Sequence, residues 1–133
     1  MKKYVTELIG TFFLVFVIGL TGNPIAIGAI LMTMVFMGGH VSGAHYNPAV
    51  TLAILIRKKI ELNDAIMYMV FQIIGALLAA LAFHFMYGKL FAPAPDHTIN
   101  ILKPLFIEIV FTFSLASFVL NVAKHSGTNV KSF

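Results

Sequence analysis

The sequence predicts an all-α membrane protein with four transmembrane helices and one re-entrant half-helix, in a single membrane domain over residues 1–133. Hydrophobic residues make up 59% of the chain and charged residues 11%, whereas a soluble domain is about half apolar and a quarter charged. Four apolar stretches approach the roughly 20 residues that a spanning helix requires. A fifth, at 48–56, is too short to cross a bilayer.

The first two stretches, residues 4–20 and 24–38, predict a hairpin of antiparallel helices. The turn between them reads Thr21-Gly22-Asn23-Pro24, and glycine, asparagine and proline are typical of tight turns. A secretory leader is the alternative for the first stretch, because two lysines precede its apolar run. We favour a spanning helix, since Glu7 interrupts that run and residues 20–24 make a poor cleavage site.

Residues 39–56 lie between two positions that the basic residues place on the same side of the membrane. Lysine and arginine concentrate on the cytoplasmic side, and a cytoplasmic N-terminus puts seven of them inside and two outside. The inner set is Lys2, Lys3, Arg57, Lys58, Lys59, Lys124 and Lys131, and the outer set is Lys89 and Lys103. Segment 48–56 must therefore enter and leave on one side. As a helix it would be about 13 Å long, near half of the hydrocarbon core.

The residues before this half-helix predict a wet cavity. Segment 39–46 is glycine-rich and is expected to be non-helical, and free carbonyls at membrane depth are tolerated only where they line water. Asn47 is expected to cap the half-helix by accepting the N–H of Val50, with Pro48 at the first helical position. The Asn47 amide NH2 would then face outward beside the positive end of a helix dipole. Such a donor would hold a water oxygen and repel cations.

The last two apolar stretches are residues 65–87 and 104–123, with a proline-containing external loop over 89–103. Asn63 is expected to cap the first of them, and Asp64 suits its first turn. Residues 7–14 and 108–115 share Glu, Thr, Phe and Leu in register. Three spans separate the two copies, so they run in opposite directions. This arrangement predicts an inverted-topology repeat, which is common in membrane transport proteins.

These features together resemble one family, the aquaporin or major intrinsic protein channels for water and small neutral solutes. The run Ser42-Gly43-Ala44-His45-Tyr46-Asn47-Pro48-Ala49-Val50-Thr51 is similar to the family's first Asn-Pro-Ala loop almost residue for residue. The resemblance implies an aquaporin-like fold in which residues 1–103 form a first repeat and 104–133 begin an incomplete second one. It is further carried by Glu7 with Gly10-Thr11-Phe12, Gln72 with Gly75-Ala76, and Glu108 with Thr112-Phe113.

The resemblance also implies a pore site. It assigns an Asn-Pro-Ala motif with one of two mid-membrane donors, backbone carbonyls that line the pore, an outer selectivity-filter position and two buried carboxylates that support the re-entrant loops. An aliphatic filter residue favours a permissive range of solutes. The motif is Asn47, Pro48 and Ala49, and the pore-lining carbonyls are those of Gly43, Ala44, His45 and Tyr46. The filter position is Ile27, and the supporting carboxylates are those of Glu7 and Glu108.

Other chemistry is less well supported. Proton relay is the alternative for the two glutamates, because a carboxylate in an apolar span costs about 2.5–3.5 kcal/mol on insertion scales. The chain has no cysteine, and His40 and His45 lack a third ligand, so we predict no metal site and no cofactor. The embedded polar groups form no nucleophile–base pair, which argues against an enzyme.

The sequence therefore predicts a passive channel for water and small neutral solutes such as glycerol. By resemblance it would assemble as a homotetramer in the cell membrane, with lipid and solute as partners and no nucleic acid. Family members have six spans and two Asn-Pro-Ala loops, but this sequence ends at Phe133 before the second loop. The alternative is a truncated, non-conducting protein that associates with full-length relatives. Pairing of two oppositely inserted chains is disfavoured by the charge bias.

Overall fold

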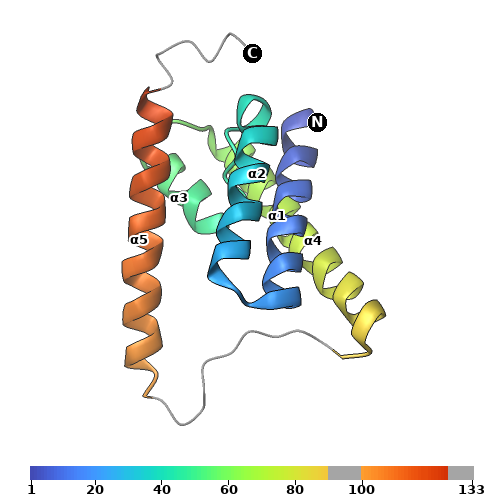
Figure 1. Cartoon of the computed structure of the whole chain (residues 1–133). Coiled ribbons are helices and arrows are strands. Elements are labelled where there is room, and N and C mark those ends of the chain that lie inside the picture. The colour runs from blue at the N-terminus through green and yellow to red at the C-terminus, as the bar shows by residue number, and fades with distance from the viewer. Residues whose placement is uncertain (90–99, 126–133) are drawn as a thin grey trace. The chain divides into compact units, whose positions relative to one another are not determined.

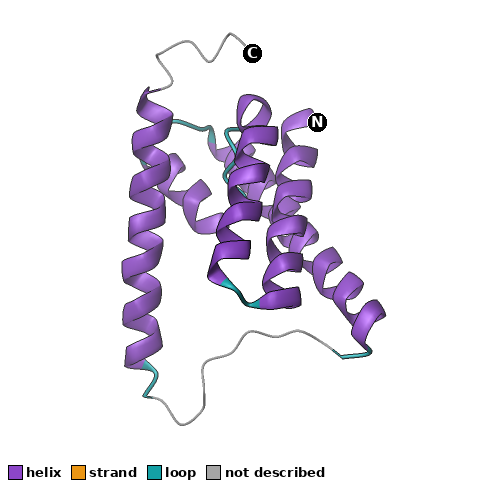
Figure 2. Ribbon diagram, in the orientation of Figure 1, coloured by secondary structure: helices purple, strands orange, loops and turns teal. Residues whose placement is uncertain are grey.

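The computed structural model describes residues 1–89 and 100–125, and these residues form five α-helices (Figures 1 and 2). Four of the helices are long and apolar enough to cross a membrane, and the fourth of these qualifies over Leu102–Leu120. The predicted spans and the half-helix are thereby confirmed. The helices are α1 (Lys2–Thr21), α2 (Pro24–Ser42), α3 (Pro48–Ile56), α4 (Leu62–Tyr87) and α5 (Leu102–His125).

The chain forms two compact units, Met1–Phe91 with α1 to α4 and Ala92–Phe133 with α5. In the first unit, α1 packs against both α2 and α4, and α3 packs against α4. The predicted boundary between repeats at residue 103 stays a prediction. Most of the predicted external loop, residues 90–99, lies outside the described residues.

The turn between α1 and α2 forms as its sequence predicts. Gly22 adopts a left-handed conformation with φ 59°, and its N–H donates to the carbonyl of Ile18 at 3.2 Å. The side chain of Asn23 accepts the N–H of Ile25 at 2.9 Å, and Pro24 takes the first helical position. These caps end one helix and start the next within two residues, which produces the antiparallel hairpin in Figure 1.

The end of α2 differs from the prediction. The helix continues to Ser42, so the segment after residue 38 is helical rather than irregular, and the loop is confined to residues 43–47. The helix stops where Gly43 adopts a left-handed conformation with φ 85° and donates its N–H to the Gly39 carbonyl at 3.0 Å. Glycine content alone therefore misplaced this boundary, because Gly38 is needed for packing rather than for a turn. A Cβ at Gly38 would overlap the Tyr46 hydroxyl.

The start of α4 also differs from the prediction. Glu61 is the N-cap residue and forms no side-chain cap, so Asn63 lies inside the first turn and does not cap the helix. Asp64 lies in that turn, as expected. It accepts hydrogen bonds from Lys3 Nζ and from the Tyr4 hydroxyl, each at 2.6 Å. This contact joins the first turns of α1 and α4, so residues 43–61 leave and return at one end of the unit (Figure 1).

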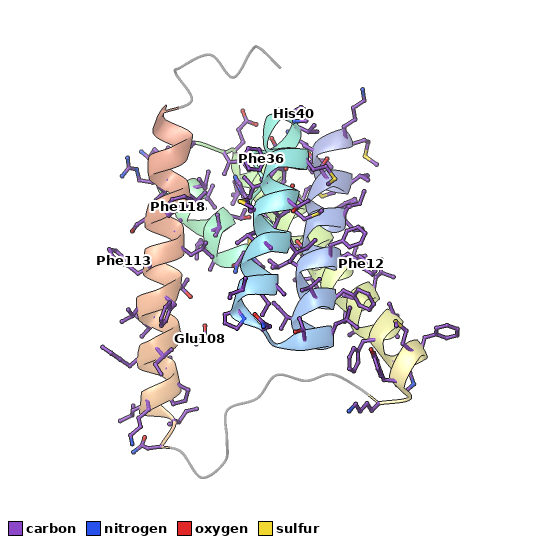
Figure 3. All side chains as sticks on the ribbon, viewed as in Figure 1. Phe12, Phe36, His40, Glu108, Phe113 and Phe118 are labelled. Atoms are coloured by element: carbon purple, nitrogen blue, oxygen red, sulfur yellow. The ribbon has the colours of Figure 1, made fainter. Side chains whose placement is uncertain are left out.

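Two glycines allow the helices of the first unit to approach closely. A Cβ at Gly75 of α4 would collide with the backbone carbonyl of Leu8 in α1, and one at Gly10 would overlap the ring of Tyr46. Small residues at such contacts are typical of helices packed in lipid. Large apolar side chains cover the outside instead, including Phe36, which is 80% exposed (Figure 3). The exterior is therefore suited to contact with acyl chains.

Candidate functional site

The carboxylate of Glu7 is the centre of a buried hydrogen-bond network. Glu7 lies in the second turn of α1 and is completely buried. Its Oε1 accepts the hydroxyl of Ser42 at 2.6 Å and the N–H of His45 at 3.0 Å. Its Oε2 accepts the N–H of Tyr46 at 2.6 Å and the amide of Gln72 at 2.8 Å. One side chain thus joins α1 to α2, to the loop and to α4.

This arrangement uses the Glu7 carboxyl group as a hydrogen-bond acceptor. Each oxygen of Glu7 accepts two hydrogen bonds, and only the ionised form is purely an acceptor. Hydrogen bonds to a charged acceptor are also stronger than neutral ones, so four of them offset the cost of burying the charge.

The loop backbone is held in an unusual conformation. Besides Gly43, both Ala44 and Tyr46 have positive φ values, of 53° and 50°. A left-handed conformation costs about 1–2 kcal/mol for a residue with a Cβ. The N–H of Ala44 donates to the Ser42 hydroxyl at 3.1 Å, and that of Tyr46 donates to Glu7. Surrounding contacts therefore impose the conformation that these two residues would otherwise avoid.

The loop carbonyls fall into two groups. Among the hydrogen bonds within the described residues, none is accepted by the carbonyl oxygens of Gly43, Ala44 or His45. The carbonyl of Tyr46 accepts the hydroxyl of Thr11 at 3.1 Å. A backbone carbonyl without a protein partner needs another donor, such as water or a polar solute. Tyr46 therefore differs from the other three residues named for this role.

The side chain of Tyr46 has a structural role that was not predicted. Its ring is 1% exposed, and its hydroxyl donates to the carbonyl of Met34 at 2.7 Å. The ring lies against Gly10 of α1 and Gly38 of α2, where a Cβ would overlap it. The Tyr46 side chain thus packs between the loop and two helices. The glycines at these two positions were the signal that could have indicated it.

A second set of hydrogen bonds links the loop, α3 and α4. The Nδ1 of His45 lies 3.1 Å from the hydroxyl of Thr51, which also accepts the Gln72 amide at 3.0 Å. The ring of His45 meets that of Tyr68 edge to face at a centroid distance of 5.0 Å. The Tyr68 hydroxyl donates to the carbonyl of Ser42 at 2.7 Å. His45 is therefore fixed from both sides.

Removing the Tyr68 hydroxyl tests this second set. Tyr68→Phe leaves the buried Ser42 carbonyl without that partner, so we expect the free energy of unfolding to fall by about 1–3 kcal/mol. Unfolding in mixed micelles, followed by circular dichroism, measures the change. Tyr87→Phe is the matched control, because Tyr87 is 52% exposed and its loss should cost less than about 0.5 kcal/mol. Equal values for the two variants would contradict the contact's importance.

Asn47 begins α3 with its side chain divided between two tasks. Its Oδ1 accepts the N–H of Ala49 at 2.7 Å, and not that of Val50 as predicted. Both N–H groups are free in the first turn, and the short side chain reaches the nearer one. Within the described residues the Asn47 amide nitrogen donates to no protein acceptor. Pro48 is exposed at the first helical position, while Asn47 and Ala49 are half-buried.

The remaining predicted positions lie elsewhere. Ile27 is half-buried in the first turn of α2, at the end away from the loop. Glu108 lies in α5 of the second unit (Figure 3). Their predicted roles stay predictions. His40 is exposed whereas His45 is buried, and in the described part of the chain no three His, Cys, Asp or Glu side chains gather as a metal ion would require.

Four long apolar helices, together with a short helix whose chain leaves and returns at one end of the first unit, define a multi-pass helical membrane protein with a re-entrant segment. The chain belongs to the major intrinsic protein family, whose sequence model matches residues 18–132. This result confirms the predicted family and its all-helical aquaporin fold.

Similar proteins include a glycerol uptake facilitator-like protein and several aquaporins. The chain is 36% identical to glycerol uptake facilitator protein-like 6 of Lactiplantibacillus plantarum over 150 aligned positions, which cover 97% of the chain and 67% of that protein. It is 33% identical to aquaporin NIP1-1 of Zea mays, covering 92% and 49%. With aquaporin Z of Photorhabdus laumondii it shares 36% identity, covering 60% and 41%. The chain thus spans between 41% and 67% of the length of these relatives.

Proposed function

We propose that this chain supplies the wall and one mid-membrane donor of a passive channel for water and small neutral solutes such as glycerol. The observation that carries the proposal is the state of Asn47. Its oxygen is engaged by the Ala49 N–H, while its amide nitrogen has no acceptor among the described residues. An NH2 group held in this way at a helix N-terminus is ready to donate to a passing oxygen atom.

The loop supplies the complementary acceptors. Water or a hydroxylated solute would accept a hydrogen bond from Asn47 and donate to the free carbonyls of Gly43, Ala44 and His45. The positive end of the α3 dipole, at Pro48, disfavours cations. Ordered donors, acceptors and dipoles of this kind are sufficient for selective passage without covalent chemistry. Glu7 would contribute indirectly, by holding the loop in place.

The relatives' names support the solute class, since they include a glycerol uptake facilitator and aquaporins. In this proposal Ile27 occupies the outer filter position, and its aliphatic side chain admits solutes wider than water. Asn47 acts with a second donor at mid-membrane, and Glu108 supports the loop that carries it. In this proposal the protein is a homotetramer in the cell membrane. Its N-terminus lies in the cytoplasm, an orientation that the bias of basic residues indicates.

Asn47→Asp separates the capping role of Asn47 from its donor role. Aspartate caps a helix as well as asparagine, so the variant should keep the cap bond from the Ala49 N–H. The amide donor is lost and a negative charge replaces it. We therefore expect water permeability to fall about tenfold, equivalent to about 1.4 kcal/mol, and exclusion of cations to weaken. Osmotic shrinkage of liposomes, followed by light scattering, measures permeability.

The same liposomes test whether the chain conducts by itself. With insertion verified, shrinkage several-fold faster than that of empty liposomes would show that the chain conducts by itself. If liposomes with and without the chain shrink at the same rate, the chain alone forms no pore, and the alternative of a non-conducting protein that associates with longer relatives takes its place. Unchanged transport in Asn47→Asp, in a preparation that conducts, would refute the donor role.

A further inference from the structure

The turn that joins α3 to α4 carries three consecutive cations, Arg57, Lys58 and Lys59, here called the basic turn. All three side chains are exposed. The one ion pair among residues 1–89 and 100–120 joins Lys3 to Asp64, and the basic turn takes no part in it. Three positive charges are thus presented together at one end of the first unit.

The carboxylates of residues 1–89 do not neutralise this charge. Glu7 is buried and occupied by four donors. Asp64 is held by Lys3 and Tyr4. Glu61 is the one other carboxylate in residues 1–89, so it could balance no more than one of the three cations. At least two of the three cations therefore have no carboxylate partner within residues 1–89 and are available to an anion from outside the chain.

The backbone fixes the basic turn in a conformation that favours glycine. Lys58 has φ 54°. Its N–H donates to the Leu55 carbonyl at 2.8 Å, and the N–H of Lys59 donates to the Ile54 carbonyl at 3.1 Å. This pair of bonds is a Schellman motif, in which the left-handed position is usually glycine. Lys58 occupies a position where glycine would adopt the conformation without steric cost. We take the presence of a cation at this position as a sign that its charge has a binding role.

Exposed apolar side chains flank the basic turn. Ile56 on one side is 71% exposed, and Leu62 on the other is 60% exposed. A free phosphate ion would use the cations alone, whereas a phospholipid would use both features. Guanidinium and ammonium groups are the usual ligands of phosphate oxygens. We propose that the basic turn binds the phosphate of an anionic phospholipid, whose acyl chains lie against Ile56 and Leu62. This site does not depend on conduction.

Competition between phospholipids in detergent tests the site. The full chain is purified in a neutral detergent with equal amounts of phosphatidylglycerol and phosphatidylcholine, and native mass spectrometry counts the lipids bound. Membrane orientation does not contribute in detergent. Each cation near an anionic headgroup should contribute about fivefold. We therefore expect the wild type to prefer phosphatidylglycerol at least about tenfold, and R57Q/K58Q/K59Q to prefer it less than about twofold.

A matched triple variant, K2Q/K89Q/K103Q, removes the same charge elsewhere and should keep the wild-type preference. Lys58→Gly suits the left-handed backbone, so it should fold normally and lose about fivefold in preference. Circular dichroism confirms the helix content of each variant. Three results would overturn the proposal: no lipid preference in the wild type, an equal loss in both triple variants, or displacement of phosphatidylglycerol by millimolar inorganic phosphate, which would show a site for the free ion.

Discussion

Replacing Glu7 with Gln is expected to lower the free energy of unfolding by about 1–3 kcal/mol, because at least one buried N–H donor would lose its acceptor. Each carboxylate oxygen accepts two hydrogen bonds. An amide keeps one oxygen and places an NH2 group at the other position. The Ser42 hydroxyl can accept as well as donate, but in either orientation the amide NH2 faces a backbone N–H, that of His45 or that of Tyr46. The variant therefore disrupts the contact of α1 with the loop, with α2 and with α4.

Two measurements distinguish this effect from a general loss of charge. Unfolding in mixed micelles gives the change in stability, and Glu61→Gln is the matched control. Glu61 is exposed, so its variant should lie within about 0.5 kcal/mol of the wild type. Hydrogen exchange at the N–H groups of His45 and Tyr46 gives the local effect, which should be faster exchange in Glu7→Gln. A stable variant with both N–H groups still protected would show that the loop is held by other contacts.

Gly75→Ala is expected to cost about 1–3 kcal/mol through overpacking between α1 and α4. The added methyl group would collide with the Leu8 carbonyl oxygen. This atom belongs to a helix backbone, so it cannot move aside as a flexible side chain would. The helices must separate instead, and this would loosen contacts along their whole length, including the hydrogen bond from Gln72 to Glu7.

Gly28→Ala provides the comparison for this effect. Gly28 also lies within a helix, but a Cβ there would meet no other atom within 4 Å. Alanine favours the helical conformation over glycine by about 0.8–1.0 kcal/mol, so this variant should be as stable as the wild type or more so. Both are measured by the same unfolding assay. Equal loss of stability in the two variants would show that helix propensity, rather than the contact with Leu8, controls the effect.

Much of the fold could be predicted because its signals are local. Apolar length specified the four spans, and the bias of basic residues required a segment that returns to its own side. The half-helix begins at Pro48 and ends at Ile56 as predicted, because an Asn-Pro pair starts a helix and basic residues end the apolar run. The predicted end of α2 was wrong because the signal at that position is not local. Gly38 and Gly39 resemble turn residues in isolation, but one of them makes room for Tyr46.

The site was predicted less completely than the fold. Asn47 could be recognised from its neighbours, although its bond goes to Ala49 rather than Val50. The packing of Tyr46 between α1 and α2, and the contacts of Thr51 and Tyr68, could not be recognised in this way. They depend on how each helix is rotated about its axis, and the spans are apolar on nearly every face, so periodicity does not reveal the rotation.

Local residues thus account for the membrane class, the number of spans and the capped half-helix, since length, caps and charge bias act within a few positions of the chain. The hydrogen-bond partners of Glu7 are determined by the tertiary structure instead. Ser42, His45, Tyr46 and Gln72 lie 35 to 65 positions away from it along the chain. They meet because glycines at the helix contacts allow close packing, and because a buried carboxylate is stable only when its oxygens are satisfied. That convergence arises from packing, and it holds the loop that presents Asn47.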